Sequence, residues 1–193
     1  MPEVYDLLLE RIISVKFADP IFNCQMGRGR TTTGMVICCL VRLIFGNGAV
    51  ATLMEEKVGT PNFSTDAART AILGYARGEF AIILQLLEVL NHGKLAKFLT
   101  DLAIDQCSHV QNLRECIFEY RSKLENLVPG TPKYVMIMET AWNYLIRYFH
   151  LISFADYLIE THSIPASKSS FTSWLEKRRE IQYILRIGSR SLN

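Results

Sequence analysis

Apolar residues recur at intervals of three and four positions along most of the chain, a period typical of helices with one buried face. The first stretch, residues 2–15, carries a proline in its opening turn, where the missing backbone N–H has no helical partner to lose. Glycine at 46 and the Pro-Gly-Thr-Pro run at 129–132 interrupt the pattern. The sequence therefore predicts a mainly helical chain. The expected helices are residues 2–15, 29–46, 66–75, 79–90, 94–105, 107–127, 134–149, 153–160 and 171–185.

One short segment departs from the helical pattern. Residues 21–23 follow the helix-breaking pair Asp19-Pro20 and predict a strand, the only convincing one in the sequence. A lone strand leaves its backbone N–H and C=O groups without a ladder partner. Either the strand pairs with another chain or segment, or the rest of its sheet lies upstream of Met1, and we favour the second. On this interpretation residues 1–193 form a single, N-terminally incomplete domain, with residues 1–48 carrying the loop described next and residues 49–193 forming a helical part.

The segment after this strand has the composition of a phosphate-binding loop. Cys24 and Arg30 are separated by five residues, two of which are Gly27 and Gly29, and an apolar helix follows. Glycines allow the backbone freedom that a tight loop requires. Backbone N–H groups that point inward from such a loop, together with the positive end of the next helix, bind anions. We call residues 24–30 the signature loop.

Each residue type in this loop has a chemical role toward a phosphate monoester. The thiolate form of cysteine is the nucleophile, and it is favoured near arginine and helix N-termini, so Cys24 is the predicted attacking group. The guanidinium of Arg30 matches two phosphate oxygens, and the Thr31 hydroxyl can donate a hydrogen bond to the Cys24 sulfur. The residues expected to bind the substrate through backbone amides are Gln25, Met26, Gly27, Arg28 and Gly29.

Two other phosphate-binding motifs do not fit the loop. It contains no lysine, which a P-loop nucleotide hydrolase requires, and Thr32 stands where the dinucleotide fingerprint needs a third glycine. The combination of Cys24, Arg30 and Thr31 instead resembles the signature loop of cysteine-dependent phosphatases of the protein tyrosine phosphatase superfamily. The wider string of residues 22–37 is similar to paladin-type proteins, which are related to the cysteine phytases that act on inositol phosphates. Residues 78–80 and 111–117 share this similarity.

The resemblance implies an α/β fold of the protein tyrosine phosphatase-like type, of which this chain would hold mostly the α part. It also implies an enzyme that hydrolyses a phosphorylated protein or an inositol phosphate through a phosphocysteine intermediate, without a metal or organic cofactor. The family's general acid is an aspartate upstream of the loop, which here would fall before Met1, because Asp6 and Asp19 are poorly positioned in the sequence. The alternative is therefore a weak or inactive pseudophosphatase that binds phosphorylated ligands.

Arg28 is an additional guanidinium within the loop. It either faces solvent or contacts a second phosphate, as a polyphosphorylated inositol would require.

The composition of the chain excludes some classes of protein and favours others. The formal net charge of +2 and the absence of a basic stripe argue against nucleic-acid binding. The five cysteines show no metal-ligand spacing, and Cys38, Cys39, Cys107 and Cys116 resemble small core residues of helices, so we expect a reduced, cytoplasmic protein. No apolar run long enough to span a membrane occurs.

Overall fold

The computed structural model describes residues 2–15, 19–25, 29–46, 74–163 and 169–188. Helices dominate these ranges, and no strand forms within them, which confirms the mostly α expectation. The predicted helix at residues 66–75 falls largely outside the described residues. The helices are α1 (Pro2–Ser14), α2 (Gly29–Phe45), α5 (Ala81–Val89), α6 (Gly93–Gln106), α7 (Leu113–Glu125), α8 (Pro132–Ser163), α9 (Phe171–Lys177) and α10 (Arg179–Gly188).

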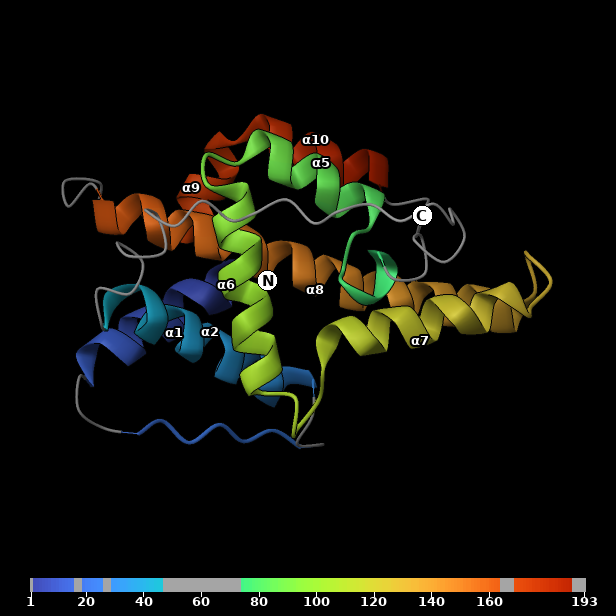
Figure 1. Cartoon of the computed structure of the whole chain (residues 1–193), viewed down its shortest axis with the longest axis horizontal. Coiled ribbons are helices and arrows are strands. Elements are labelled where there is room, and N and C mark those ends of the chain that lie inside the picture. Colours follow the sequence, from blue (N-terminus) through green and yellow to red (C-terminus); the bar gives the residue numbers. More distant parts are fainter. Residues whose placement is uncertain (1, 16–18, 26–28, 47–73, 164–168, 189–193) are drawn as a thin grey trace.

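Helix α8 forms the centre of the molecule. It crosses the whole fold, with α1 and α2 below it, α5 and α10 above it, and α6 passing over it (Figure 1). Its middle is buried on every side, and the fully buried residues there include the apolar Leu151, Ile152 and Phe154 and the polar Ser153 and Asp156. A helix that is buried all round must be surrounded by other elements.

The predicted helix boundaries are wrong in α8 and in the C-terminal segment that packs against it. The sequence favoured separate helices at 134–149 and 153–160, but α8 runs unbroken through both because no proline or glycine interrupts it. The C-terminal prediction of residues 171–185 is instead split into α9 and α10 at Arg178. The Arg178 guanidinium pairs with Glu160 of α8 and lies over the Trp174 ring, so a tertiary contact holds the break.

Helix α7 also begins later than predicted. Residues 107–110 form a turn rather than the first turn of a helix. The helix starts at Leu113, because the Asn112 side chain accepts hydrogen bonds from the backbone N–H groups of Arg114 and Glu115. The turn between α6 and α7 brings residues 107–112 toward the start of α2 (Figure 1).

The strand predicted at residues 21–23 does not form. These residues have no regular secondary structure, and the Ile21 side chain is 95% exposed. The physical reason is that a lone strand has no partner for its backbone hydrogen bonds, and the described residues offer no second strand to complete a ladder.

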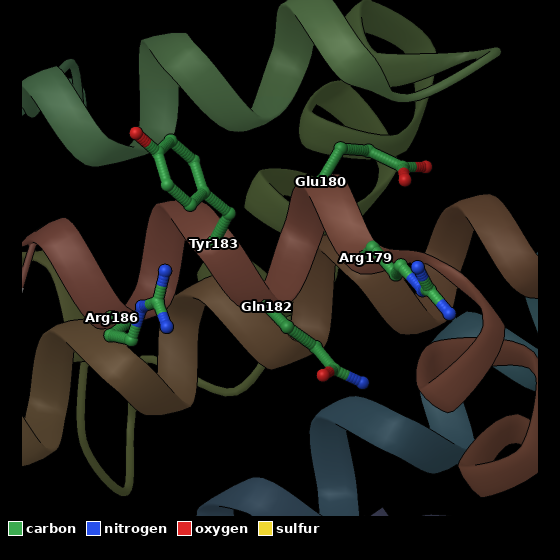
Figure 2. Close-up of a pocket in the computed structure, with 5 residues that line it drawn as sticks. All are labelled: Arg179, Glu180, Gln182, Tyr183 and Arg186. Atoms are coloured by element: carbon green, nitrogen blue, oxygen red, sulfur yellow. The ribbon is translucent and has the colours of Figure 1, made fainter.

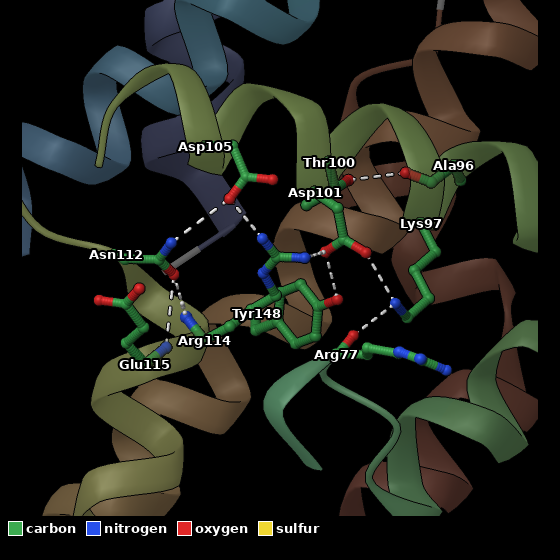
Figure 3. A network of polar contacts seen from close by, with 10 residues as sticks. All are labelled: Arg77, Ala96, Lys97, Thr100, Asp101, Asp105, Asn112, Arg114, Glu115 and Tyr148. Atoms are coloured by element: carbon green, nitrogen blue, oxygen red, sulfur yellow. Dashed lines mark hydrogen bonds and ion pairs between the residues drawn. The ribbon is translucent and has the colours of Figure 1, made fainter. Parts of the chain in front are cut away.

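A network of polar contacts ties α6, α7 and α8 together (Figure 3). Asp101 of α6 accepts a hydrogen bond of 2.6 Å from the Tyr148 hydroxyl of α8 and one of 2.7 Å from Lys97 Nζ. The guanidinium of Arg114 on α7 lies 3.5 Å from the same carboxylate and also pairs with Asp105. Burial raises the pKa of the Tyr148 phenol well above its usual range, so its hydroxyl stays protonated and donates.

Gly78 packs directly against this network. Its φ of +76° lies in the left-handed region, and a Cβ there would come within 2.7 Å of the Tyr148 hydroxyl oxygen. Residues 78–80 and 111–117, which share the family resemblance described above, therefore meet around the same buried tyrosine and its partners.

His150 makes the stability of the fold sensitive to acid. Burial lowers the pKa of this side chain to about 4 from an ordinary 6.5. The unfolded chain takes up a proton as pH falls below about 6.5, whereas the folded chain does so only near pH 4, so stability falls across this window. We expect His150→Phe to reduce the stability lost between pH 7 and pH 4.5 by about 2 kcal/mol, measured by urea unfolding at both pH values. The exposed His109, replaced by glutamine, is the matched control and should leave the difference unchanged.

Candidate active site

The nucleophile candidate lies at the N-terminus of α2. Cys24 is half-buried, and its Sγ lies 3.0 Å from the Thr31 Oγ1, which donates a hydrogen bond to it. Thr31 is buried in the first turn of α2, so its hydroxyl is held in place by the helix. Gly29 begins this helix, and its carbonyl accepts a 2.7 Å hydrogen bond from the Thr33 hydroxyl. The contact between sulfur and hydroxyl is the kind that stabilises a thiolate.

The other loop residues occupy different environments. Gln25 is exposed in the turn after Cys24, and Arg30 is exposed in the first turn of α2. Met26, Gly27 and Arg28 lie outside the described residues. The structure therefore brings together the thiol, the Thr31 hydroxyl and the start of α2, and the assignment of the full signature loop stays a prediction.

Arg147 lies beside the candidate site, although its position in the sequence did not indicate this. It extends from α8 to the start of α2, where a Cβ on Gly29 would lie 2.8 Å from its Nη1. Together with Gln111 from the turn before α7, Arg147 and Gly29 line a narrow crevice of about 10 Å³. In the sequence, Arg147 is only a charged residue within an apolar run. Gln111 is only the first residue of the segment 111–117 that shares the family resemblance. No local signal links either residue to a loop so far away in the chain.

Phe22 anchors the segment that leads into Cys24. A Cβ on Gly34 of α2 would lie 2.6 Å from Phe22 Cδ1, so the ring rests against the helix backbone where a side chain is missing. Gly34 therefore sets how closely the chain before Cys24 approaches α2.

Gly34→Ala is expected to destabilise the protein by about 1–2 kcal/mol, since the clash with Phe22 outweighs the roughly 1 kcal/mol gained in helix propensity. In a Phe22→Ala background the same substitution should instead stabilise by about 1 kcal/mol. Urea unfolding of the four variants of this double-mutant cycle measures both effects. An identical effect of Gly34→Ala in the two backgrounds would contradict the packing of Phe22 on α2.

The two aspartates nearest in sequence to the loop have other partners. The Asp6 carboxylate accepts hydrogen bonds from the backbone N–H groups of Phe171 and Thr172, at 2.6 Å and 3.0 Å, and so caps the start of α9. Asp19 pairs with Arg42 at 3.1 Å on the surface. Asp6 therefore has a structural role at α9 and Asp19 takes part in a surface ion pair, and the expectation that neither acts as the general acid stays a prediction.

A surface depression larger than the crevice beside Gly29 lies on α10. It has a volume of about 520 Å³ and is lined by side chains from α10 (Figure 2). These are Arg179, Glu180, Gln182, Tyr183 and Arg186. This depression does not include the thiol or the start of α2, so it is separate from the candidate site.

Two negative findings apply to the described residues. They contain no group of three or more His, Cys, Asp or Glu side chains placed to hold a metal ion. Within the same ranges, none of the helices has both the length and the apolar character needed to cross a bilayer.

Comparison with known proteins identifies relatives of this chain. Residues 2–42 match the PTP-like phytase family, whose description names inositol hexakisphosphate. Paladin of Homo sapiens is 31% identical over 161 residues, and paladin of Gallus gallus is 32% identical over 164 residues. Each alignment covers 80% of this chain and 17% of the relative. Paladin of Mus musculus is 28% identical over 185 residues, covering 91% of this chain and 20% of the relative.

The chain thus spans about a fifth of the length of the paladins that it matches. No solved structure shows significant similarity to it. The family match includes the signature loop, and the paladin alignments extend the similarity over most of the helical part. The protein therefore belongs to the paladin-type family of protein tyrosine phosphatase-like proteins.

Proposed function

We propose that this protein is a cysteine-dependent phosphatase that hydrolyses phosphomonoesters through a phosphocysteine intermediate. The observation that carries the proposal is the 3.0 Å hydrogen bond from Thr31 Oγ1 to Cys24 Sγ at the N-terminus of α2. The match to the PTP-like phytase family and the similarity to paladins support a phosphatase-type function.

In the first step the Cys24 thiolate attacks phosphorus, the bond to the alcohol leaving group breaks, and the phosphoryl group becomes attached to sulfur. The guanidinium of Arg30 and the amides of residues 25–29 bind the phosphate oxygens, where negative charge is concentrated. The positive end of α2 contributes in the same direction.

In the second step water attacks the phosphocysteine, and the Cys24 thiolate leaves. The Thr31 hydroxyl donates a hydrogen bond to this sulfur, so it stabilises the negative charge that develops there. Thr31 is therefore assigned mainly to intermediate breakdown, and Arg30 to both steps.

The second candidate is a pseudophosphatase that binds a phosphorylated ligand without turning it over. The partners of Asp6 and Asp19 motivate it, because the first carboxylate accepts hydrogen bonds from α9 and the second pairs with Arg42. Without a general acid, hydrolysis of esters with poor leaving groups would be slower by about 10²–10⁴-fold.

One experiment separates the two candidates. The protein is incubated with an aryl phosphate whose leaving group needs no protonation, with and without vanadate, and quenched samples are analysed by mass spectrometry. An enzyme should give vanadate-sensitive turnover and a phosphoryl group on the peptide that contains Cys24. Binding of a phosphorylated ligand without turnover or adduct would favour the pseudophosphatase, and the absence of both turnover and binding would contradict the proposed function.

Arg28 is proposed to contact a second phosphate of a polyphosphorylated substrate. Replacing Arg28 by alanine should then lower kcat/KM for inositol hexakisphosphate at least about ten times more than kcat/KM for a small aryl phosphate, because one charge-assisted hydrogen bond is lost only with the former. Phosphate release and aryl-alcohol absorbance measure the two rates. Equal losses on both substrates would show that Arg28 does not distinguish them.

A further inference from the structure

Two cysteines outside the candidate active site lie within reach of each other. Cys39 is on α2 and Cys107 follows the last residue of α6, and their Sγ atoms are 3.9 Å apart. The end of α6 lies beside α2 in the fold (Figure 1). Because the two residues are 68 positions apart in sequence, tertiary packing alone brings the sulfurs together.

We propose that Cys39 and Cys107 are a peroxide-sensitive modification site, at which the two thiols are oxidised to a reversible disulfide that links α2 to the turn after α6. A disulfide bond is about 2.05 Å long, so the sulfurs must approach by a little under 2 Å. Both are reduced in this structure, and they share a hydrogen bond.

The two thiols differ in exposure and in pKa, as a reaction between one attacking thiolate and one resolving thiol requires. Cys39 is half-buried, whereas Cys107 is only 2% exposed. The hydrogen bond with Cys107 lowers the pKa of Cys39 to about 7, with Arg42 acting in the same direction. The hydrogen bond to Cys39, together with burial, raises the pKa of Cys107. Cys39 is therefore the reactive thiolate, and Cys107 is the thiol that resolves its oxidised form.

The oxidation proceeds in two balanced steps. The Cys39 thiolate attacks one oxygen of hydrogen peroxide, the O–O bond breaks, hydroxide leaves, and Cys39 becomes a sulfenic acid. The Cys107 sulfur then attacks the Cys39 sulfur, the S–O bond breaks, and the departing hydroxide takes up the Cys107 proton as water. Overall, two thiols lose their hydrogens and one peroxide is reduced to two waters.

The disulfide would have a mechanical effect on two parts of the fold. Residues 107–112 form the turn that brings Gln111 to the crevice beside Gly29. A covalent bond at Cys107 would fix this turn to α2, whose first residue is Gly29. It would also close a long loop and so reduce the conformational freedom of the unfolded chain.

The test is made on the whole chain. The reduced protein is treated with hydrogen peroxide, remaining thiols are alkylated, and peptides are mapped by mass spectrometry without reductant. Cys38 is adjacent to Cys39, so the variants Cys38→Ala, Cys39→Ala and Cys107→Ala assign the bond. We expect a link in the wild-type protein and in Cys38→Ala, reversed by dithiothreitol, and no link in Cys39→Ala or Cys107→Ala. Because the measured quantity is the bond itself, the result does not depend on phosphatase activity.

Thermal unfolding supplies a second measurement. The oxidised wild-type protein and oxidised Cys38→Ala should have a Tm higher than their reduced forms by about 5 °C or more, and the reductant should abolish the difference. A bond that persists in Cys39→Ala would assign the pair to Cys38 and overturn the proposal. In the wild-type protein, oxidation of Cys24 shows that the peroxide has reacted with the protein. If Cys39 and Cys107 are both still alkylated after that treatment, the proposal is also overturned. This outcome does not depend on the folding of any variant.

Discussion

Cys24→Ser is expected to lower kcat for an aryl phosphate by at least about 10⁴-fold while leaving the fold intact. A serine hydroxyl is protonated at neutral pH and is a far weaker nucleophile than a thiolate, so the covalent step is lost. The side chain is half-buried at the start of α2, and serine preserves its size and a hydrogen-bonding atom near Thr31. Steady-state turnover and urea unfolding measure the two parts of this prediction.

A matched control separates the nucleophile from other thiols. Cys116→Ser changes a half-buried cysteine of α7, whose sulfur accepts a hydrogen bond from Gln111, and should leave kcat within a few-fold of wild type. Retained binding of a phosphorylated ligand by Cys24→Ser would show that the binding site survives. Turnover by Cys24→Ser at a rate close to wild type would exclude a phosphocysteine intermediate on Cys24.

Asp101→Ala is expected to lower the free energy of unfolding by about 3 kcal/mol. The Asp101 carboxylate is 16% exposed and accepts contacts from Lys97, Arg114 and Tyr148 (Figure 3). Its removal leaves the buried Tyr148 hydroxyl and the largely buried Arg114 guanidinium without this partner. Removing one member of a buried charged network lowers the free energy of unfolding much more than removing an exposed residue, because the remaining polar groups stay desolvated.

Asp105→Ala is the matched control for this prediction. Asp105 pairs with the same Arg114 guanidinium from the next turn of α6, but its side chain is 54% exposed. Its loss should cost less than about 1 kcal/mol. Urea unfolding of both variants at pH 7 gives the comparison, and equal costs would show that burial does not determine the strength of this network.

Local patterns were sufficient for some elements and failed for others. Helices α1, α2, α5 and α6 were predicted well, since each has its own amphipathic period and a clear end. The predictions failed where a partner decides the conformation. Arg178 breaks the C-terminal helix through its contact with Glu160, and residues 21–23 stay outside any sheet because the described chain provides no neighbouring strand.

For the candidate site, the sequence alone was sufficient to predict a chemistry for the loop. The Cys24–Arg30 spacing, the glycines and Thr31 stand within a few residues of one another, so their combined pattern is visible without a structure. Only the tertiary structure placed Arg147 against Gly29 and Cys39 beside Cys107. These residues come from helices far apart in the chain, and their distances depend on how the helices pack around α8, which no local sequence pattern specifies.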